Sequence, residues 1–208
     1  RPMGLGVGIS LARGPKGRGL VAYDGDSGNL VGLFDRGKSP WERVVLDGEV
    51  GSTADKSALD TGNAGTAASL LIDDSNVWHV SYVELTSQTL RYLEVHDGKP
   101  ERPDIVADGA TVEGATTARH WVGDDSQVRL SNGQIEIVYT DSTTLGMKRA
   151  FGKGAAGARS WEAKAVTQPD GRWVAFPRYV PGDSLTLSWW RLGIAGSRSV
   201  AGNVTSLP

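Results

Sequence analysis

The sequence of 208 residues contains no cysteine, only two methionines and only three histidines. Without cysteine the chain has no disulfide framework, no thiol nucleophile and no cysteine-ligated zinc site. No segment approaches the roughly 18 consecutive apolar residues of a transmembrane helix. The net charge is only −2, from 22 basic and 24 acidic residues. This balance, without a basic cluster, argues against electrostatic binding of nucleic acid.

Several familiar catalytic and binding patterns are also missing. The three histidines, His79, His96 and His120, lie on different expected elements and have no zinc-site spacing. The glycine-rich segment 4–8 leads into an expected strand, so the helix N-terminus that would hold a phosphate is absent. No nucleophile elbow and no phosphate-binding loop occurs. We therefore predict neither catalytic residues nor a nucleotide site, and no cofactor other than a calcium ion.

Glycine and tryptophan are abundant instead. The chain has 28 glycines, roughly twice the average usage of about 7%. It also has seven tryptophans, against five tyrosines and three phenylalanines. No segment shows a sustained helical period. This composition favours an all-β chain with many turns.

Similar stretches recur along the chain at intervals of about 50 to 60 residues, which indicates an internal repeat. Each contains one strongly apolar strand that ends in an aromatic anchor, and the anchors are Tyr23, Tyr82, Tyr139 and Trp189. Another apolar strand and a hairpin signal precede each anchor strand, such as Asn132-Gly133. Within the second anchor strand Trp78, Val80 and Tyr82 alternate onto one face, as strand geometry requires.

Each repeat is predicted to form four antiparallel strands of about 5–8 residues. Polar stretches at 47–66 and 108–125 are expected to join one repeat to the next. Twisted four-stranded units of this kind are the blades of a β-propeller. We therefore interpret residues 1–208 as a single propeller region with approximate repeats 3–63, 64–123, 124–170 and 171–208.

Two stretches resemble known propeller sequences. The segment from Val77 to Tyr82, followed by a polar turn and Leu90–Leu93, resembles the degenerate propeller repeats of secreted bacterial proteins. More distantly, the segment from Asp35 to Trp41 is similar to the Asp-box turn of sialidase-type propellers, although it has one extra residue before the tryptophan. The resemblance covers most of residues 5–192 and implies a sialidase-like or lectin-like propeller fold, without implying an activity.

The number of blades leaves three alternatives open. The sequence contains three full repeats and a fourth that looks incomplete, or about 3.5–4 blades. It could form a compact four-bladed ring, or part of a larger ring that a protein partner, a second copy or another part of the precursor completes. It could also be a fragment of a fibre or shell. The chain starts at Arg1 without a signal-peptide pattern, which is compatible with a processed piece or with an arbitrary boundary.

One loop has the residues of a cation site. The loop from Asp24 to Asn29 carries Asp24 and Asp26 on a tight glycine turn, and alternating carboxylates can wrap a calcium ion. The order of residues differs from that of an EF-hand, and the other repeats lack the pattern. The alternative is an ordinary hairpin turn.

Three tryptophans do not follow the pattern of buried positions, namely Trp121, Trp173 and Trp190. Exposed tryptophan beside polar residues is a common platform for a sugar ring or a protein partner. We therefore take these three as candidate ligand-binding residues. The alternative is that they pack against a neighbouring blade or chain.

The sequence favours a non-catalytic binding or assembly module of a secreted or cell-surface bacterial protein, with a protein partner or a glycan as ligand. A second hypothesis is a glycoside hydrolase or lyase, which would need acidic and basic residues from several blades at the channel mouth. Its candidates are Arg18, Asp24, Glu84, Asp141 and Arg178. A third hypothesis is a purely structural subunit of an extracellular assembly. None of these includes nucleic acid or a transmembrane segment.

Overall fold

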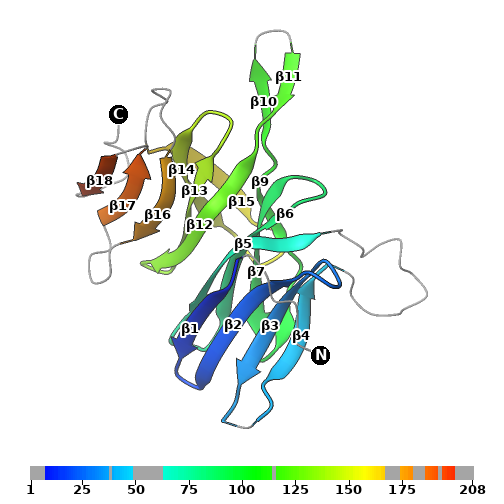
Figure 1. Ribbon diagram of the computed structural model, residues 1–208. Helices are drawn as coiled ribbons and strands as arrows, with labels where there is room; N and C mark the ends of the chain where they lie inside the picture. Colours follow the sequence, from blue (N-terminus) through cyan, green and yellow to red (C-terminus); the bar gives the residue numbers. More distant parts are fainter. Residues whose placement is uncertain are drawn as a thin grey trace.

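The computed structural model describes residues 8–37, 39–48, 63–113, 116–166, 174–179, 186–191 and 194–199. The described residues form strands and turns without any helix, and so include no helix that could cross a membrane. They build four antiparallel sheets of three or more strands that follow one another along the chain, together with one separate two-stranded hairpin, and Figure 1 shows their arrangement.

The first and third sheets each contain four strands in sequence order. The first sheet consists of β1 (Ser10–Gly14), β2 (Gly17–Asp24), β3 (Asn29–Asp35) and β4 (Glu42–Asp47). The third consists of β12 (Val122–Ser131), β13 (Gln134–Asp141), β14 (Gly146–Lys153) and β15 (Ser160–Ala165).

The second sheet shares its outer position between two short strands, since β8 and β9 both pair with β7. Its strands are β5 (Ala64–Ile72), β6 (Trp78–Glu84), β7 (Thr89–His96), β8 (Lys99–Pro100) and β9 (Asp104–Ala107). The fourth sheet has three described strands, which are β16 (Val174–Tyr179), β17 (Thr186–Arg191) and β18 (Ile194–Ser199).

The segment expected to be a polar linker at 108–125 contains more structure than the sequence indicated. A separate hairpin forms there from β10 (Ala110–Glu113) and β11 (Thr116–Arg119), and β12 begins at Val122. Strand β12 thus begins within this expected linker, and β5 likewise begins at Ala64, within the expected linker at 47–66. Both strands start earlier than the apolar pattern predicted. Both contain bulges, with residues Ala67 and Asp125 at positive φ, and these irregularities hide the alternation of side chains at the start of each strand.

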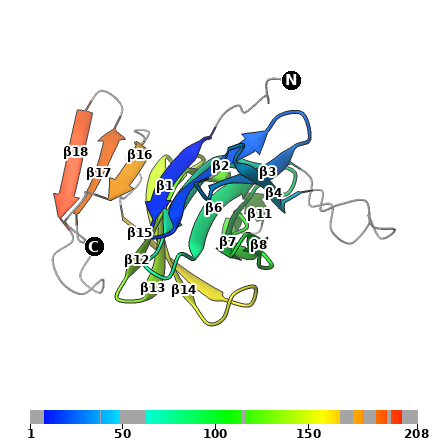
Figure 2. The ribbon, with the colours of Figure 1, turned by 90° about the horizontal axis from the view of Figure 1, so that it is seen from below.

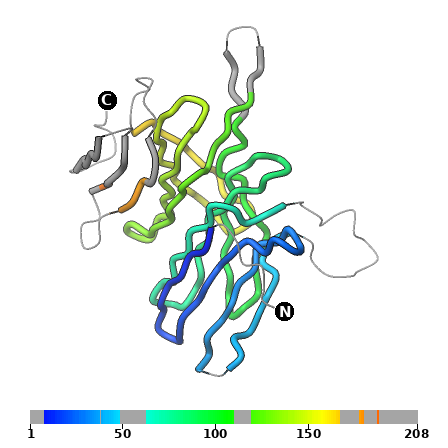
Figure 3. The backbone as a smooth tube through the Cα atoms, in the orientation of Figure 1, coloured from blue at the N-terminus to red at the C-terminus, as the bar shows by residue number. Residues whose placement is uncertain are grey.

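Each sheet packs on the next one along the chain, and the innermost strands β1, β5, β12 and β16 lie beside one another. Figure 2 shows the same succession from below, and Figure 3 follows the backbone from the first sheet, in blue, to the second, in cyan and green. This arrangement of twisted four-stranded sheets confirms the predicted β-propeller fold.

The two faces of a sheet have different roles in this packing. We call the face that meets the preceding sheet the leading face and the opposite one the trailing face. Trp78, Val80 and Tyr82 lie on the leading face of the second sheet and pack with Val21 and Leu30 of the first sheet. Tyr82 is fully buried, and burial of such a side chain contributes roughly 2 kcal/mol. The predicted shared face of the second anchor strand is thus confirmed.

The trailing face of the second sheet carries Leu90 and Tyr92, which pack on Ile137 and Tyr139 of the third sheet. Val138 and Met147 on the trailing face of the third sheet then pack on Leu187 of the fourth. All three contacts between sheets thus use the same pair of faces. Apolar alternation along the strands therefore accounts for the succession of blades.

The register of the first repeat differs from the sequence-based expectation. The hairpin turns after β2, β6 and β13 are equivalent, because in each a carboxylate residue pairs with the residue five positions later: Asp24 with Asn29, Glu84 with Thr89, and Asp141 with Gly146. This alignment makes Ala22, not Tyr23, the equivalent of Tyr82 and Tyr139. The prediction that Tyr23 is the anchor of the first repeat is wrong, because the geometry of the hairpin turn sets the register of the strands.

A glycine allows the close approach of the first two sheets. A Cβ atom at Gly19 on β2 would lie 2.2 Å from the ring of Trp78. The indole therefore needs a residue without a side chain at this place. The backbone of β2 forms part of the surface on which Trp78 rests.

Candidate binding cleft between the first and second sheets

Four turns meet at one end of the first two sheets. Because the strands of each sheet run antiparallel, the turn after the first strand and the turn after the third lie at the same end. The turns β1–β2, β3–β4, β5–β6 and β7–β8 enclose a cleft of about 170 Å³. This volume is below the roughly 300 Å³ at which drug-sized sites begin, so the cleft fits a small ring.

The floor of this cleft is apolar. It consists of Phe34, Ile72, Trp78 and Val95, all of which are buried. The rings of Phe34 and Trp78 stack with their centroids 3.9 Å apart, so the floor is rigid. It comes from both sheets and depends on their packing.

The rim of the cleft is charged, with both signs represented. Lys16 lies 3.9 Å from a carboxylate oxygen of Asp97, and the two side chains are 68% and 79% exposed. The Nη2 of Arg36 donates to the backbone oxygen of Asp97 at 3.3 Å, and its Nε lies 3.0 Å from Glu42. The backbone N–H of Lys16 also donates to Oδ1 of Asn76, at 3.2 Å. The rim contacts therefore connect the turns of one sheet to those of the other.

Asp35 orders the turn between β3 and β4. Its Oδ1 accepts a hydrogen bond from the backbone N–H of Gly37 at 2.9 Å, and its Oδ2 accepts two from Arg18 at 2.8 and 2.6 Å. The bond from Gly37 and the guanidinium of Arg18 lower the pKa of this carboxyl. Arg18 also lies over the ring of Trp41, 5.5 Å from its centroid. The segment similar to an Asp-box thus folds as a hydrogen-bonded turn.

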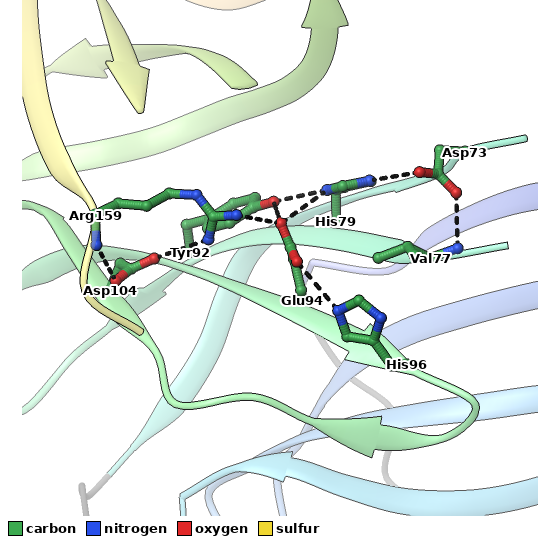
Figure 4. A network of polar contacts seen from close by, with 8 residues as sticks. All are labelled: Asp73, Val77, His79, Tyr92, Glu94, His96, Asp104 and Arg159. Atoms are coloured by element: carbon green, nitrogen blue, oxygen red, sulfur yellow. Dashed lines mark hydrogen bonds and ion pairs between the residues drawn. The ribbon is translucent and has the colours of Figure 1, made fainter. Parts of the chain in front are cut away.

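A polar network on the trailing face of the second sheet supports two of the cleft turns, as Figure 4 shows. Asp73 accepts a hydrogen bond from the backbone N–H of Val77 at 2.7 Å and lies 3.4 Å from Nε2 of His79. The Nδ1 of His79 lies 2.6 Å from the hydroxyl of Tyr92, which donates to Glu94 at 3.0 Å. Burial lowers the pKa of His79. This network fixes the β5–β6 turn that carries Asn76.

The third sheet contributes a cation to this network. Arg159, between β14 and β15, forms ion pairs with both Glu94 and Asp104 of the second sheet. Its backbone N–H donates to Asp104 at 3.0 Å. Burial alone would raise the pKa of Glu94, but the guanidinium of Arg159 and the other hydrogen-bond donors lower it. The second cleft turn is thus supported through His96, which lies 3.1 Å from Glu94 and directly before Asp97.

The three carboxylates considered for a catalytic site lie away from this cleft and have a different role. Asp24, Glu84 and Asp141 occupy equivalent positions before the hairpin turns at the opposite end of the sheets. Each accepts hydrogen bonds from the backbone of its own turn. Each also lies beside a cation, which is Arg43, Arg91 or Lys148. Burial alone would raise their pKa values, but these contacts lower them. Through these hydrogen bonds the three carboxylates stabilise the hairpin turns that follow them.

The two residues of the expected calcium loop lie at this same end. Asp24 accepts a hydrogen bond from the hydroxyl of Ser27 at 2.9 Å and pairs with Arg43 at 2.6 Å, while Asp26 is exposed. Within the described ranges no group of three histidine, aspartate or glutamate side chains is placed to hold a metal ion. The calcium site stays a prediction, and the described residues supply no third carboxylate or histidine ligand for it.

The three candidate tryptophans are not brought together. Trp121 is half-buried at the end opposite the cleft, where its backbone N–H donates to the hydroxyl of Thr143 at 2.9 Å. Trp190 is on β17, with its backbone paired to Ala175 and Ala195, and its side chain is outside the described part. Trp173 lies outside the described residues altogether. Their role in ligand binding stays a prediction.

A second cleft, of about 250 Å³, lies between the second and third sheets near Trp121. It is lined by His120, Tyr139 and Lys148 among others. The Nδ1 of His120 lies 3.0 Å from Oδ2 of Asp141, and Nζ of Lys148 lies 2.7 Å from the same oxygen. The polar groups of this cleft thus converge on one buried carboxylate.

The stability of the protein is expected to depend on the ionisation of Asp141. Although burial raises its pKa, hydrogen bonds from Lys148, His120 and the turn backbone lower it from 3.8 to about 2. A depressed folded-state pKa stabilises the fold above the unfolded value, and this contribution, about 2 kcal/mol, is lost as the pH falls from about 5 to 2. Measurement of the free energy of unfolding across this range should show a difference between wild type and Asp141→Asn that shrinks by that amount. A difference independent of pH would contradict this assignment.

Comparison with known proteins finds similar structures but no similar sequence. No family model matches the chain, and no curated protein matches its sequence. The fold is similar to that of the Bacteroides ovatus protein named Xyloglucan PUL GH43B, with a TM-score of 0.51 and 13% identity, over 91% of this chain and 36% of that chain. The chain therefore spans little more than a third of that protein.

Two further solved structures are similar at lower scores. The NanB sialidase of Streptococcus pneumoniae has a TM-score of 0.48 and 12% identity, over 83% of this chain and 25% of that chain. A protein of unknown function from Dyadobacter fermentans has a TM-score of 0.49 and 13% identity, over 87% and 56% of the two chains. At such identities a likeness concerns the fold, so function must be argued from the clefts and surfaces of this chain.

Proposed function

We propose that the chain is a non-catalytic binding module on a β-propeller scaffold, and that the cleft between the first and second sheets takes a neutral carbohydrate. The observation that carries this proposal is the combination of a rigid apolar floor with a charged rim built from four turns. Turns held on a rigid sheet scaffold are common places for binding residues.

The chemistry of the rim favours a neutral polyol over a charged ligand. Three cations, Lys16, Arg18 and Arg36, stand beside three carboxylates that pair with them. Positive and negative charges therefore balance, while both hydrogen-bond donors and acceptors remain within reach of a ligand. A sugar ring presents hydroxyl groups to such a rim and its C–H groups to an apolar floor.

The fold is compatible with this proposal. The name of the Bacteroides ovatus neighbour refers to xyloglucan, a carbohydrate, and that protein shares the propeller fold with this chain. We also propose that the protein works outside the cell, as a secreted or cell-surface bacterial protein, where glycans are abundant ligands.

A glycan array followed by titration of the best-bound neutral glycan tests the proposal. Arg36→Ala is expected to weaken binding about tenfold or more, because it removes a charged hydrogen-bond donor. The fold should be unaffected, since an exposed pair such as Arg36–Glu42 contributes about 1 kcal/mol or less. Lys164→Ala is the control, because Lys164 forms a similar exposed pair on β15, away from the cleft.

Two outcomes would contradict the proposal. Binding that is equally sensitive to both substitutions, or to neither, would place the ligand elsewhere. Hydrolysis of the bound glycan would favour the alternative of a glycoside hydrolase or lyase.

A further inference from the structure

A cluster of three charged residues lies on the trailing face of the third sheet, where the fourth sheet packs. Arg129, Glu136 and Arg149 come from the neighbouring strands β12, β13 and β14. Glu136 pairs with both arginines through the Nε and Nη2 atoms of their guanidinium groups. The side chains of Glu136 and Arg149 are 2% exposed, and that of Arg129 is 11% exposed. Two positive charges thus share one negative charge, which leaves the buried cluster with an excess of one positive charge.

No second described carboxylate pairs with this cluster. On the adjacent strand β15, Glu162 and Lys164 lie 3.1 Å apart and pair with each other. The rings of Tyr179 and Phe151 lie 4.0 and 5.3 Å from the guanidinium carbons of the two arginines. An aromatic ring attracts a cation through its quadrupole but leaves the net charge unchanged. The excess positive charge therefore has no counter-ion among the described residues.

The two arginines also carry hydrogen-bond donors that the protein does not use. The Nη1 atoms of Arg129 and Arg149 are buried, and neither has a hydrogen-bond partner in the described part of the chain. A buried lysine, histidine or carboxyl group can avoid this cost through a shift of its pKa, which makes it neutral. An arginine cannot lose its proton in a protein, so a buried arginine needs an anion beside it.

We propose that a small monovalent anion, chloride under physiological conditions, binds to this cluster and accepts hydrogen bonds from the buried Nη1 groups. One negative charge makes the cluster neutral, whereas a water molecule at the same donors would leave the charge in place. Val138, Met147 and Leu187 are fully buried in the same interface, and such apolar surroundings strengthen the attraction between the ion and the guanidinium groups. The linings of the two clefts include neither arginine, so this site is separate from the proposed glycan cleft.

The unfolding equilibrium constant, measured at increasing chloride concentration, tests this proposal. Sodium methanesulfonate keeps the ionic strength constant, so that general screening by salt does not change. Once chloride exceeds its Kd, each tenfold increase in its concentration should lower the unfolding constant about tenfold. Bromide should replace chloride. In crystals grown from sodium bromide, anomalous scattering should place the ion within hydrogen-bond distance of Nη1 of Arg129 or Arg149.

Three variants separate this site from a general effect of salt. Arg149→Met leaves one arginine paired with one glutamate, so the chloride dependence should disappear. Glu136→Gln leaves two arginines without a carboxylate, so chloride should bind about tenfold more tightly or better and lessen the destabilisation of this variant. Lys164→Met is the matched control, because it removes an exposed cation of the neighbouring strand and should keep the dependence of the wild type.

The proposal would be overturned by a wild-type stability that does not respond to chloride, or by an equal response in Arg149→Met. Bromide crystals with only water at the Nη1 groups would also overturn it. If Arg149→Met does not fold, the other two variants decide the matter, since an equal chloride dependence in Glu136→Gln and Lys164→Met contradicts a site at this cluster. None of these results affects the proposed glycan cleft.

Discussion

Replacement of Glu136 by glutamine is expected to lower the free energy of unfolding by about 3 kcal/mol or more. Glu136 is 2% exposed and lies between two arginines on the trailing face of the third sheet. It accepts hydrogen bonds from Nε and Nη2 of Arg129 at 2.9 and 2.6 Å, and it pairs with Arg149, which is also buried. Glutamine keeps the shape but removes the charge, which leaves two buried guanidinium groups without a counter-ion.

Among the described residues, no carboxylate other than Glu136 pairs with either arginine. The Nη1 atoms of Arg129 and Arg149 already lack a hydrogen-bond partner, and Tyr179 of the fourth sheet meets Arg129 with its ring, 4.0 Å from the guanidinium carbon. The fall in melting temperature should be roughly 10 °C for a chain of this size. Calorimetry or chemical denaturation would measure it.

Glu162→Gln is the matched control on the neighbouring strand β15. Its partner Lys164 lies 3.1 Å away, and the two side chains are 56% and 42% exposed. Such a surface pair contributes about 1 kcal/mol or less. Equal effects of the two substitutions would show that burial of the Glu136 cluster is not what makes it important.

Substitution of Gly123 by alanine is expected to cost about 2 kcal/mol or more. Gly123 lies in the bulged start of β12 with φ of +99°, a conformation that side chains rarely adopt. A Cβ atom there would also stand 2.9 Å from both Leu90 and Val83 of the second sheet. The substitution therefore adds backbone strain and pushes the second and third sheets apart. The free energy of unfolding, from urea denaturation, would measure the cost.

Gly133→Ala separates the two causes. Gly133, in the turn between β12 and β13, also has a positive φ, +75°, but no atom lies within 4 Å of the added Cβ position. Only the backbone strain remains, which is about 1 kcal/mol. If Gly123→Ala were no more harmful than this control, close approach of the sheets at Gly123 would not be limiting.

Much of the fold was accessible from the sequence because strand alternation has a period of two residues. The apolar face of Trp78, Val80 and Tyr82 and the succession of four-stranded units both follow from this pattern and from turn residues. The register of the first repeat did not follow from the pattern. Tyr23 is the aromatic residue near the end of its strand, but the hairpin turn makes Ala22 the residue equivalent to Tyr82. Alignment of the repeats on the turn residues Asp24, Glu84 and Asp141 would have given the correct register.

The candidate cleft was not accessible from the sequence. Its rim residues, such as Lys16, Arg36 and Asp97, are far apart along the chain. Arg36 lies in the segment similar to an Asp-box, but that likeness indicated a turn and not a binding site. The rim residues meet only because the alternating direction of the strands places four turns at one end of two packed sheets. Trp121, one of the candidate tryptophans, lies at the opposite end of the sheets, so it does not mark this cleft.

The ion pairs between sheets have a consequence for cooperativity. Asp47 with Arg91 and Glu94 with Arg159 each link consecutive sheets, while the turn carboxylates, Asp24 for example, close hairpins within one sheet. Among the described sheets, energetic coupling therefore passes from each sheet to its neighbour, as in a linear repeat array. Loss of one interface would divide the succession of sheets into two groups that unfold separately. The hairpins would be the smallest units to remain folded.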